Sequence, residues 1–408
     1  MRIIYLHQYF NLPSMTGGTR SYEMARRMVA AGHDVHMVTS RRDSESGRSG
    51  WTTTQHEGIN VHWLDVSYRN DMGFHQRLAA FVRFAREAGR RAVGIGGDVI
   101  FASSTPLTIA LPGVHAARKL TIPMVFEVRD LWPEMPIAMG ALRSPLTIYP
   151  ALQLEKYAYR HAQRIVALSP GMAEGVAARG YPSEQISVIP NSCDVDLFRV
   201  PSAQGERFLD EHPALRGGPR VFYGGTFGRV NGLSYMVEIA SAMLAIDPSV
   251  RFVAAGEGGL KQAIIDDARR AQVYEKNFWI LPSMAKQDMP GFLSAATVAT
   301  SFVVDLEAAW KNSANKFFDA LAAGRPIAIN HEGWQADILR SSGAGLVMPA
   351  RDPRAAAMEL HDRLTDTKWL ETASTAASTL ADERFDRDRL AALLIEVLEG
   401  VVAQRPAD

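Results

Sequence analysis

Residues 298–330 read VATSFVVDLEAAWKNSANKFFDALAAGRPIAIN. The two ends of this stretch, 298–305 and 326–330, are short apolar runs typical of buried strands, and the segment between them has helical spacing. Phe317, Phe318 and Leu321 fall on the side of that helix that would face a core. A strand, a helix and a second strand in this order predict two parallel strands joined by a crossover helix.

The same alternation extends outward to most of the chain. Further strand-like runs occur at 2–9, 34–40, 59–66, 98–104, 123–130, 164–170, 185–190, 220–226, 250–256, 278–283 and 345–349. It is interrupted only at 199–219, which is rich in Pro, Gly and charge and is interpreted as a linker. We therefore predict an α/β protein with two doubly wound domains, 1–198 and 220–383, and a closing amphipathic helix in 384–408.

Composition limits the functional class. The 408 residues have a formal net charge of zero, and 47% of them are hydrophobic, so nucleic acid is not expected as a partner and each domain can bury a core. Residues 1–198 hold 21 Lys and Arg against 17 Asp and Glu. The only cysteine, Cys193, is typical of a reducing compartment, and neither a signal peptide nor a long apolar run is evident. A cytoplasmic protein is expected, and attachment to the inner face of the cell membrane is a second expectation.

The start of the helix after 305 carries donors and positive charge where helices usually carry acids. The residues concerned are Lys311, Asn312, Ser313, Asn315 and Lys316. If Ser313 caps the helix, the N–H groups of Asn315 and Lys316 can bind an external anion such as a phosphate. Asp319 follows one turn later and can accept hydrogen bonds from a ribose. The alternative is an ordinary Lys316–Asp319 pair on a solvated face.

Three glycine-rich turns also follow predicted strands, at the strand ends where open α/β sheets bind ligands. Gly17 and Gly18 follow the first strand. The segment GGTFGRVNG, 224–232, offers Gly224, Gly225, Thr226, Asn231 and a diphosphate-binding Arg229. Glu257 lies in a third turn. Each of these three could also be a plain turn.

A cluster of polar residues ends the strand at 123–130. Arg129, Asp130, Trp132 and Glu134 lie within six residues, and we interpret them as an acceptor-binding group, with a structural Arg129–Asp130 pair as the alternative. Trp132 could stack on a sugar or fill the edge of the core. The Asp194-Val195-Asp196 motif lies away from any predicted phosphate loop, and no clustered Cys/His set appears, so no metal site is expected.

Residues 72–94 predict a basic amphipathic helix. Apolar residues from Phe74 to Ala88 fall on one side, and Arg83, Arg86, Arg90 and Arg91 fall on the other. Such a helix can lie on an anionic membrane or can pack on a core with a solvated arginine face.

Four motifs in this order give the chain a family resemblance. They are LHQYF…TGGTRSYEMARRMVAAGHDVHMVTS, VRDLWPE, VIPNSCDVDLF and SANKFFDALAAGRPI. Over its whole length the chain resembles retaining glycosyltransferases of the GT-B type, family 4, in their bacterial polysaccharide and O-antigen branch. The resemblance implies two Rossmann-like domains facing a central cleft, a donor-binding C-terminal domain, an acceptor-binding N-terminal domain, and a last helix that returns to the first domain.

The family pattern is not complete in this sequence. Two glutamates with seven residues between them are common near the donor; Asp319 stands in the second place and Lys311 in the first. An arginine and a lysine are common after the first strand of the second domain, where this chain has Thr226 and Asn231. Arg229 and Lys316 are therefore expected to supply the positive charge.

The expected activity is transfer of a sugar from a nucleoside diphosphate sugar, such as a UDP-linked N-acetylated amino sugar, to a glycan, perhaps lipid-linked, acceptor. No cofactor or obligatory metal is expected. Asp130, Arg229 and Lys316 are the candidate catalytic residues. A nucleotide-sugar 2-epimerase and a non-catalytic nucleotide-sugar-binding partner of a glycosyltransferase are the alternatives.

Overall fold

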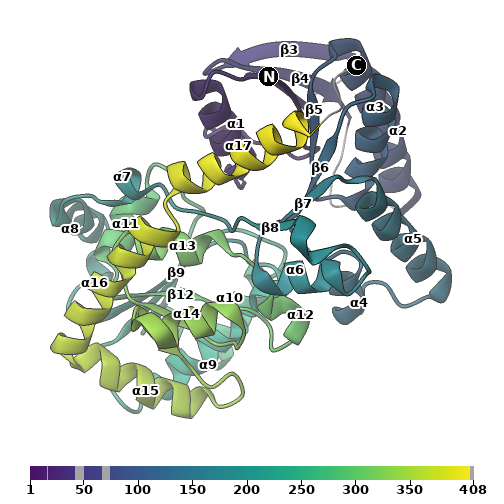
Figure 1. The fold of residues 1–408 in the computed structure, drawn as a ribbon. Helices are drawn as coiled ribbons and strands as arrows, with labels where there is room; N and C mark the ends of the chain where they lie inside the picture. The colour runs from purple at the N-terminus through teal and green to yellow at the C-terminus, as the bar shows by residue number, and fades with distance from the viewer. Residues whose placement is uncertain (16, 42–49, 67–73, 405–408) are drawn as a thin grey trace. The chain divides into compact units, whose positions relative to one another are not determined.

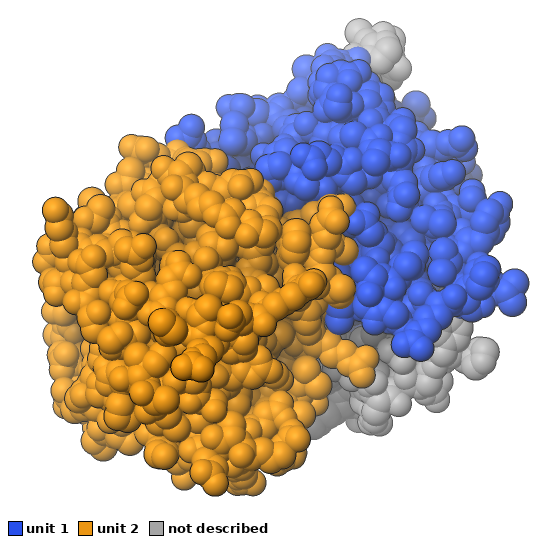
Figure 2. Space-filling view, turned by 90° about the horizontal axis from the view of Figure 1, so that it is seen from below, with its two compact units in different colours: residues 1–190, 388–408 blue, residues 191–387 orange. Residues whose placement is uncertain are grey.

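The computed structural model describes residues 1–15, 17–41, 50–66 and 74–404. The chain divides into two compact units, residues 1–190 with 388–408 and residues 191–387, coloured blue and orange in Figure 2. Each unit is an α/β domain with a mostly parallel sheet covered by helices, so the predicted fold class of two doubly wound domains is confirmed (Figure 1). The first boundary lies at 190, eight residues before the predicted end of the first domain at 198.

The sheet of unit 1 has the strand order β3-β4-β2-β1-β5-β6-β7-β8. Its strands are β1 Arg2–Leu6, β2 Asp34–Arg41, β3 Trp51–His56, β4 Ile59–Asp65, β5 Val99–Ser103, β6 Met124–Val128, β7 Arg164–Ala167 and β8 Ile186–Val188. All neighbours are parallel except β3, which pairs antiparallel with β4 at the edge of the sheet. The sequence analysis missed β3, because the strand WTTTQH is largely polar and incompletely buried.

Helices cover both faces of this sheet. They are α1 Arg20–Ala30, α2 Phe74–Ile95, α3 Ala110–Leu120, α4 Glu134–Ala138, α5 Pro145–His161, α6 Pro170–Ala177 and α17 Arg387–Ala403, with short 3-10 turns at Leu107–Ile109 and Ser183–Gln185. Along β1, Ile4 and Leu6 pack against α2, α3 and α5, whereas Ile3 and Tyr5 pack against α1 and α17. The alternation along a strand thus supplies both cores.

The last helix, α17, belongs to unit 1 from residue 388 onward. Leu390, Leu394, Leu398 and Val401 are buried in the same core as α1. The segment 384–408 was expected to return to the first domain, and its residues 388–403 do lie in unit 1.

The predicted helix at 72–94 corresponds to α2. Residues 72 and 73 lie outside the described residues, as do the side chains of 74–78. Phe84, Ala85 and Ala88 are buried under the sheet, while Arg83, Arg86 and Arg90 are exposed. Val82, predicted to share the apolar side, is instead 58% exposed, so the buried stripe is narrower than its spacing indicated.

The sheet of unit 2 has the order β11-β10-β9-β12-β13-β14 and is parallel throughout. Its strands are β9 Arg220–Gly224, β10 Arg251–Ala255, β11 Phe278–Leu281, β12 Val298–Ser301, β13 Ile327–Ile329 and β14 Gly345–Val347. Counted within the unit this is the Rossmann order 3-2-1-4-5-6, in which the chain changes direction across the sheet between β9 and β12. In open sheets of this order, ligands bind at the carboxyl ends of the strands on either side of this change of direction.

The helices of unit 2 lie on both sides of its sheet. They are α7 Val195–Phe198, α8 Ser202–Glu211, α9 Ser234–Met243, α10 Lys261–Arg270, α11 Met289–Ala295, α12 Glu307–Trp310, α13 Asn315–Ala322, α14 Trp334–Ser342, α15 Pro353–Thr365 and α16 Thr367–Arg384, with 3-10 turns at Pro213–Leu215 and Arg229–Asn231. The cores on the two faces are built around Phe222 and Phe318 on one side and Tyr223 and Phe302 on the other.

Residues 199–219, predicted as a linker, are part of unit 2. They contain α8, which packs beside α11, and Leu209 and Leu215 are fully buried in the core with Phe292. The linker prediction was wrong because the short apolar pattern of this segment lies among Pro and charged residues. Packing against the rest of the unit stabilises the pattern as a helix.

Candidate functional site

The loops that follow β9, β10 and β12 meet at the carboxyl edge of the sheet in unit 2. The N–H of Val304 donates to the carbonyl of Val230 at 2.9 Å, which joins the loops after β12 and β9. The N–H of Phe227 donates to the carbonyl of Glu257 at 2.8 Å, which joins the loops after β9 and β10. The predicted phosphate-binding segments of this unit are therefore neighbours in space.

Lys316 is the central cation of this edge. Its Nζ donates to Asn231 Oδ1 at 2.7 Å and lies 4.9 Å from the centre of the Tyr223 ring. Burial lowers the pKa of Lys316 from 10.5 to about 8, although its side chain retains some solvent exposure. No carboxylate neutralises it in any contact of the described residues, so an external anion would gain from its charge.

The turn beneath Lys316 is held by two side chains that donate to one of its backbone carbonyls. Asn231 Nδ2 and the Tyr223 hydroxyl both donate to the carbonyl of Thr226, at 2.8 and 2.9 Å. Gly225 has φ +156°, and a Cβ there would lie 3.1 Å from Lys316 Cε. A side chain at this position would be strained and would press on the lysine. Arg229 begins the 3-10 turn of this loop and is exposed to solvent.

The start of α13 lacks a side-chain cap. Its N-cap residue is Ala314, which corrects the prediction that Ser313 caps the helix. Ser313 Oγ instead accepts from the N–H of Asn191 at 3.0 Å, and Asn191 Nδ2 donates to the Ser313 carbonyl. Asn315, the first helical residue, is exposed. The first N–H groups of α13 are thus not capped by a side chain, as an anion site requires.

Asp319 does not pair with Lys316. Its Oδ1 accepts from Lys286 Nζ at 2.7 Å, and the Lys286 ammonium lies 4.6 Å from the centre of the Phe198 ring. Asp319 is 8% exposed. The alternative of an i,i+3 pair on a solvated face is therefore wrong. The sequence analysis did not find Lys286, which lies in a polar segment after β11 that has no glycine-rich motif. Only its contact with Asp319 in the folded chain shows that it belongs to the site.

Glu257 was expected to bind the donor. Its carboxylate is exposed and pairs with Lys261, one turn later on α10, at 2.5 Å. Such a surface pair contributes little to stability. The plain-turn interpretation fits Glu257 better than a donor contact does.

In unit 1, Arg129 points toward the end of β1. Its Nη1 lies 3.1 Å from His7 Nε2 and 3.4 Å from Ser21 Oγ, and the Ser21 hydroxyl and His7 Nδ1 are 2.8 Å apart. Arg129 therefore belongs to a polar cluster at the carboxyl edge of this sheet. The sequence analysis did not identify His7 and Ser21 as site residues. Neither the segment LHQYF nor the start of a helix distinguishes these two residues from their neighbours.

A second polar cluster of unit 1 is centred on Arg20 and Glu127. Arg20 donates to Glu127 Oε1 at 2.9 Å and to the carbonyls of Ile189 and Pro190, and Glu127 Oε2 accepts from Ser103 Oγ at 2.6 Å. The two charged side chains are 3% and 0% exposed. This network supports the ends of β5 and β6 from below.

The remaining acceptor candidates differ in environment. Part of Asp130 is exposed to solvent. Desolvation nevertheless raises the pKa of Asp130 to about 6, and this effect is larger than the opposite effect of the neighbouring Arg129. Trp132 is half-buried against the core, which favours the core-edge interpretation. Glu134 begins α4. Gly17 has φ +135°, and the Asn11 amide donates to the carbonyl of Gly18 at 3.3 Å, so this loop is built around glycine.

The described residues contain no group of potential metal ligands. No three of their His, Cys, Asp or Glu side chains lie close enough together to hold an ion. In the Asp194-Val195-Asp196 motif, Asp194 lies 3.1 Å from Arg387 Nε and is therefore part of an ion pair. Metal independence remains a prediction.

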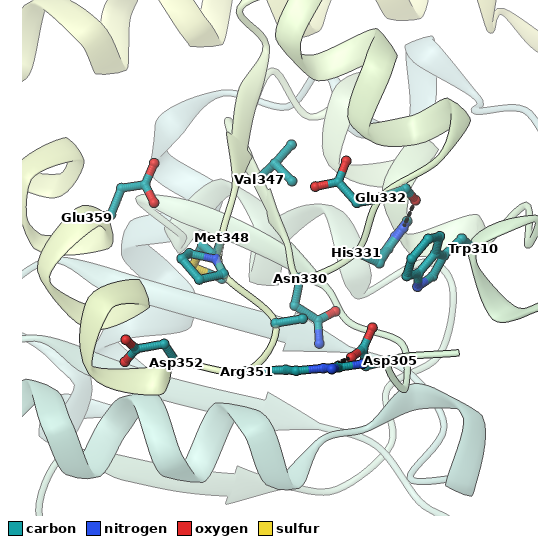
Figure 3. Close-up of a pocket in the computed structure, with 12 residues that line it drawn as sticks. Asp305, Trp310, Asn330, His331, Glu332, Val347, Met348, Arg351, Asp352 and Glu359 are labelled. Atoms are coloured by element: carbon teal, nitrogen blue, oxygen red, sulfur yellow. Dashed lines mark hydrogen bonds and ion pairs between the residues drawn. The ribbon is translucent and has the colours of Figure 1, made fainter. Parts of the chain in front are cut away.

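A cavity of about 560 Å³ in unit 2 lies elsewhere along the same sheet edge (Figure 3). Its lining residues are Asp305, Trp310, Asn330, His331, Glu332, Val347, Met348, Pro349, Ala350, Arg351, Asp352 and Glu359. None of the predicted donor residues is among them. The lining holds four carboxylates and one arginine, Arg351, which pairs with Asp305 at 2.5 Å, while Glu332 pairs with Arg340. This acidic lining is a poorer environment for a diphosphate than the surroundings of Lys316.

Comparison with protein families covers both units. Residues 16–192 match the model of a glycosyl transferase 4-like domain, and residues 218–366 match that of the glycosyl transferases group 1. The chain is built from two glycosyltransferase domains. Together they form the GT-B architecture. No curated protein matches the chain.

Solved structures of similar fold include three that span both domains. Sucrose-phosphate synthase from Thermosynechococcus elongatus has a TM-score of 0.80 at 17% identity, covering 99% of this chain and 100% of its own. Anabaena HepE in complex with UDP and glucose has 0.73 at 16%, covering 98% and 100%. An E. coli trehalose-6-phosphate protein bound with UDP-2-fluoro glucose has 0.74 at 12%, covering 100% of both. At these identities the likeness shows the fold.

Proposed function

We propose that the protein is a retaining glycosyltransferase that moves a sugar from a UDP-sugar, such as an N-acetylated amino sugar, to a glycan acceptor that is lipid-linked. The observation that carries this proposal is the convergence of Lys316, the uncapped start of α13 and the Gly224–Asn231 turn at the strand-order reversal of unit 2. Solved structures of similar fold in complex with UDP and with UDP-glucose support the choice of nucleotide.

The diphosphate would be held by charge and backbone donors together. Lys316 supplies a partly desolvated ammonium, Arg229 an exposed guanidinium, and the start of α13 at Asn315 its N–H groups. These groups are preorganised before the leaving diphosphate develops its charge, so they stabilise the transition state without reorganisation. Gly224 and Gly225 allow the phosphates to approach the backbone closely.

Asp319 would bind the ribose with the oxygen that Lys286 leaves available. A carboxylate accepts several hydrogen bonds, and the described contact uses only Oδ1. Lys286 also keeps the carboxylate charged and oriented. Asp319 is one methylene shorter than the glutamate of the resembled family, and its fixed position offsets that loss of reach.

Asp130 would orient the acceptor hydroxyl in unit 1, beside Arg129. In a front-face mechanism the departing phosphate takes the hydroxyl proton, so Asp130 does not need to be a strong base. Gly17 and Gly18 would let the backbone approach the donor closely. The reaction would take place at the inner face of the cell membrane, with helix 72–94 in contact with anionic lipid.

The test measures release of UDP from a panel of UDP-sugars, with and without extracted bacterial glycolipid, for the full chain and for Lys316→Met. We expect glycolipid-dependent release, a loss of at least about a hundredfold in the variant, and retention of the anomeric configuration by NMR. Lys276→Met, a substitution at an exposed lysine, is the matched control. Formation of an isomeric UDP-sugar without acceptor would identify an epimerase. Nucleotide binding without turnover of any donor would identify a binding module.

A further inference from the structure

Four polar side chains form one row across the amino edge of the sheet in unit 2. They are Arg251, Arg220, Thr297 and Arg325. Arg251 lies opposite Arg220 in the ladder of β10 and β9. The register of β9 and β12, continued by one residue, places Thr297 beside Arg220, and that of β12 and β13, continued by two residues, places Arg325 beside Thr297. The N–H of Thr297 donates to the Arg220 carbonyl at 2.9 Å, so the pairing of β9 and β12 does continue there.

The four side chains belong to the same face of the sheet. Side chains alternate along a strand, so each member of the row shares its face with the residue two positions further on. Those residues are all buried in one core: Val253, Phe222, Ala299 and Ile327. The row therefore lies at the amino end of that core, at the edge of the sheet opposite to the loops that contact Lys316.

The arginines at the starts of β9 and β10 are held by backbone carbonyls. Arg220 Nε donates to the carbonyl of Ala295 at 2.5 Å, and its Nη1 donates to that of Gly218 at 3.0 Å. Arg251 Nη1 donates to the carbonyl of Pro248 at 2.9 Å. Carbonyls at the end of a helix, such as that of Ala295 in α11, favour a cation. Arg220 and Arg251 thus have structural contacts of their own.

Arg325 has no such contact. Within the described residues its guanidinium makes no hydrogen bond and no ion pair, and its Nε is buried without a partner. Burial lowers the pKa of Arg325, and the charge of Arg220 lowers it further. The two guanidinium groups therefore repel each other across Thr297. A partly buried charge without a partner is costly in a folded protein.

The carboxylates around the row do not neutralise it. Glu206 acts on Arg220, but it is exposed and pairs with Arg216 at 3.1 Å. Asp247 acts on Arg251, at the other end of the row. In the described parts of the chain no carboxylate forms an ion pair with an arginine of the row. The row therefore carries an excess of positive charge.

Thr297 supplies a hydrogen-bond donor between two of the arginines. Its Oγ1 accepts from the N–H of Arg220 at 3.0 Å. A hydroxyl can accept and donate at once, and no acceptor among the described residues takes its proton. Thr297, Arg220 and Arg325 each keep part of their surface in solvent, so a small ligand can reach them.

We propose that Arg220, Thr297 and Arg325 bind a phosphate dianion, either free or as a phosphate monoester, at the amino edge of unit 2. Phosphate oxygens accept paired hydrogen bonds from guanidinium groups. Two strand spacings of about 4.8 Å separate the two arginines, and two long side chains bridge that gap through a shared anion. The bound anion offsets the repulsion between them. An arginine that only completes the end of a helix would instead donate to carbonyls, which Arg325 does not do among the described residues.

The test titrates the full chain with inorganic phosphate and with glycerol 3-phosphate by isothermal titration calorimetry, at an ionic strength held constant with chloride. We expect saturable binding of at least one of the two, and the tighter one identifies the form that the site takes. Absence of saturable binding of both would overturn the proposal. Neither titration uses UDP or an acceptor, so the outcome does not depend on the proposed transfer reaction.

Variants locate the anion. Arg325→Met should weaken phosphate binding by about tenfold or more, because hydrogen bonds to a charged group are lost. Arg325→Lys keeps the charge but not the paired donors and should bind with intermediate affinity. Arg354→Met, at an exposed arginine of α15, is the matched control with no expected change. Lys316→Met should also keep the binding. Loss of phosphate binding in Lys316→Met, with binding kept in Arg325→Met, would place the anion at the other edge and overturn the proposal.

Stability without phosphate separates an anion site from a structural arginine. In phosphate-free buffer Arg325→Met should be at least as stable to urea as wild type, because it removes a charge that has no partner and repels Arg220. Phosphate should raise the urea midpoint of wild type but not that of Arg325→Met. If Arg325→Met is less stable than wild type without phosphate, and phosphate does not stabilise wild type, Arg325 is a structural residue and the proposal is overturned.

Discussion

Lys286 and Asp319 form an ion pair in which the ammonium lies 2.7 Å from Asp319 Oδ1. The two residues come from the segment after β11 and from α13, and their side chains are 26% and 11% exposed. The carboxylate proposed to bind ribose is therefore held in position by Lys286 before any nucleotide arrives. Such preorganisation reduces the entropy that binding must overcome.

Asp319→Asn should weaken UDP binding by about tenfold or more, since the amide keeps the shape but loses the charge that strengthens a hydrogen bond to a ribose hydroxyl. Isothermal titration calorimetry measures this directly. Lys286→Gln, measured alone and with Asp319→Asn, closes a double-mutant cycle, and a non-additive effect is expected for a contacting pair. Unchanged affinity in Asp319→Asn would move the ribose contact elsewhere.

The sequence predicts the strands of this fold better than its polar contacts. The strands of unit 2 are continuous apolar runs, because a parallel sheet is buried on both faces, and each was found. The edge strand β3 is half-exposed and was not. The contact between Lys316 and Asn231 is an example of strand ends brought together by a known topology, although the pair itself was not predicted. The Ser313 cap failed because a distant residue, Asn191, occupies its hydroxyl, and no local spacing records such a contact.

UDP affinity should depend on pH through Lys316. Burial lowers the pKa of its ammonium from 10.5 to about 8, so the unliganded site loses its positive charge as pH rises above about 8. We expect calorimetric affinity for UDP to fall between pH 7 and pH 9.5. Lys316→Arg keeps its charge over this range and should bind with little dependence on pH. A wild-type affinity as flat as that of the arginine variant would contradict the lysine contact.

The same shift has a consequence for stability of the opposite sign. Between about pH 8 and 10.5 the unfolded chain retains the Lys316 proton that the folded chain has lost. The unfolded state binds more protons there, so the contribution of this group to the free energy of unfolding rises with pH. Urea unfolding of wild type and Lys316→Met across this window should show the rise only in wild type.

The Arg20–Glu127 pair should be needed for folding of unit 1. Arg20→Met would leave Glu127, which is 0% exposed, as a buried carboxylate whose remaining described partner is the Ser103 hydroxyl. Removing one partner of a buried pair costs about 3–5 kcal/mol. Urea unfolding measures the loss, and Arg216→Met, at an exposed arginine paired with Glu206, is the control with no expected change. Equal stability of the two variants would show that the buried network contributes nothing.

Ser313 should act as a positioning residue for the donor site without touching the donor. Its hydroxyl accepts from the N–H of Asn191, and its carbonyl accepts from the Asn191 amide, immediately before α13 begins at Asn315. Ser313→Ala removes the hydroxyl that accepts from the Asn191 N–H, and loss of such a hydrogen bond costs about 0.5–1.5 kcal/mol. It also frees the helix start that presents Lys316.

We therefore expect Ser313→Ala to weaken UDP binding as well as stability, and Ser313→Thr, which restores the hydroxyl, to recover both. Calorimetry and urea unfolding give the two readings, with Ser341→Ala, at an exposed serine of α14, as the control. A purely structural role would lower stability and leave the affinity for UDP unchanged at a temperature where both proteins are folded. That outcome would contradict the positioning role, because it would show that Ser313 stabilises the start of α13 without affecting the contact of Lys316 with UDP.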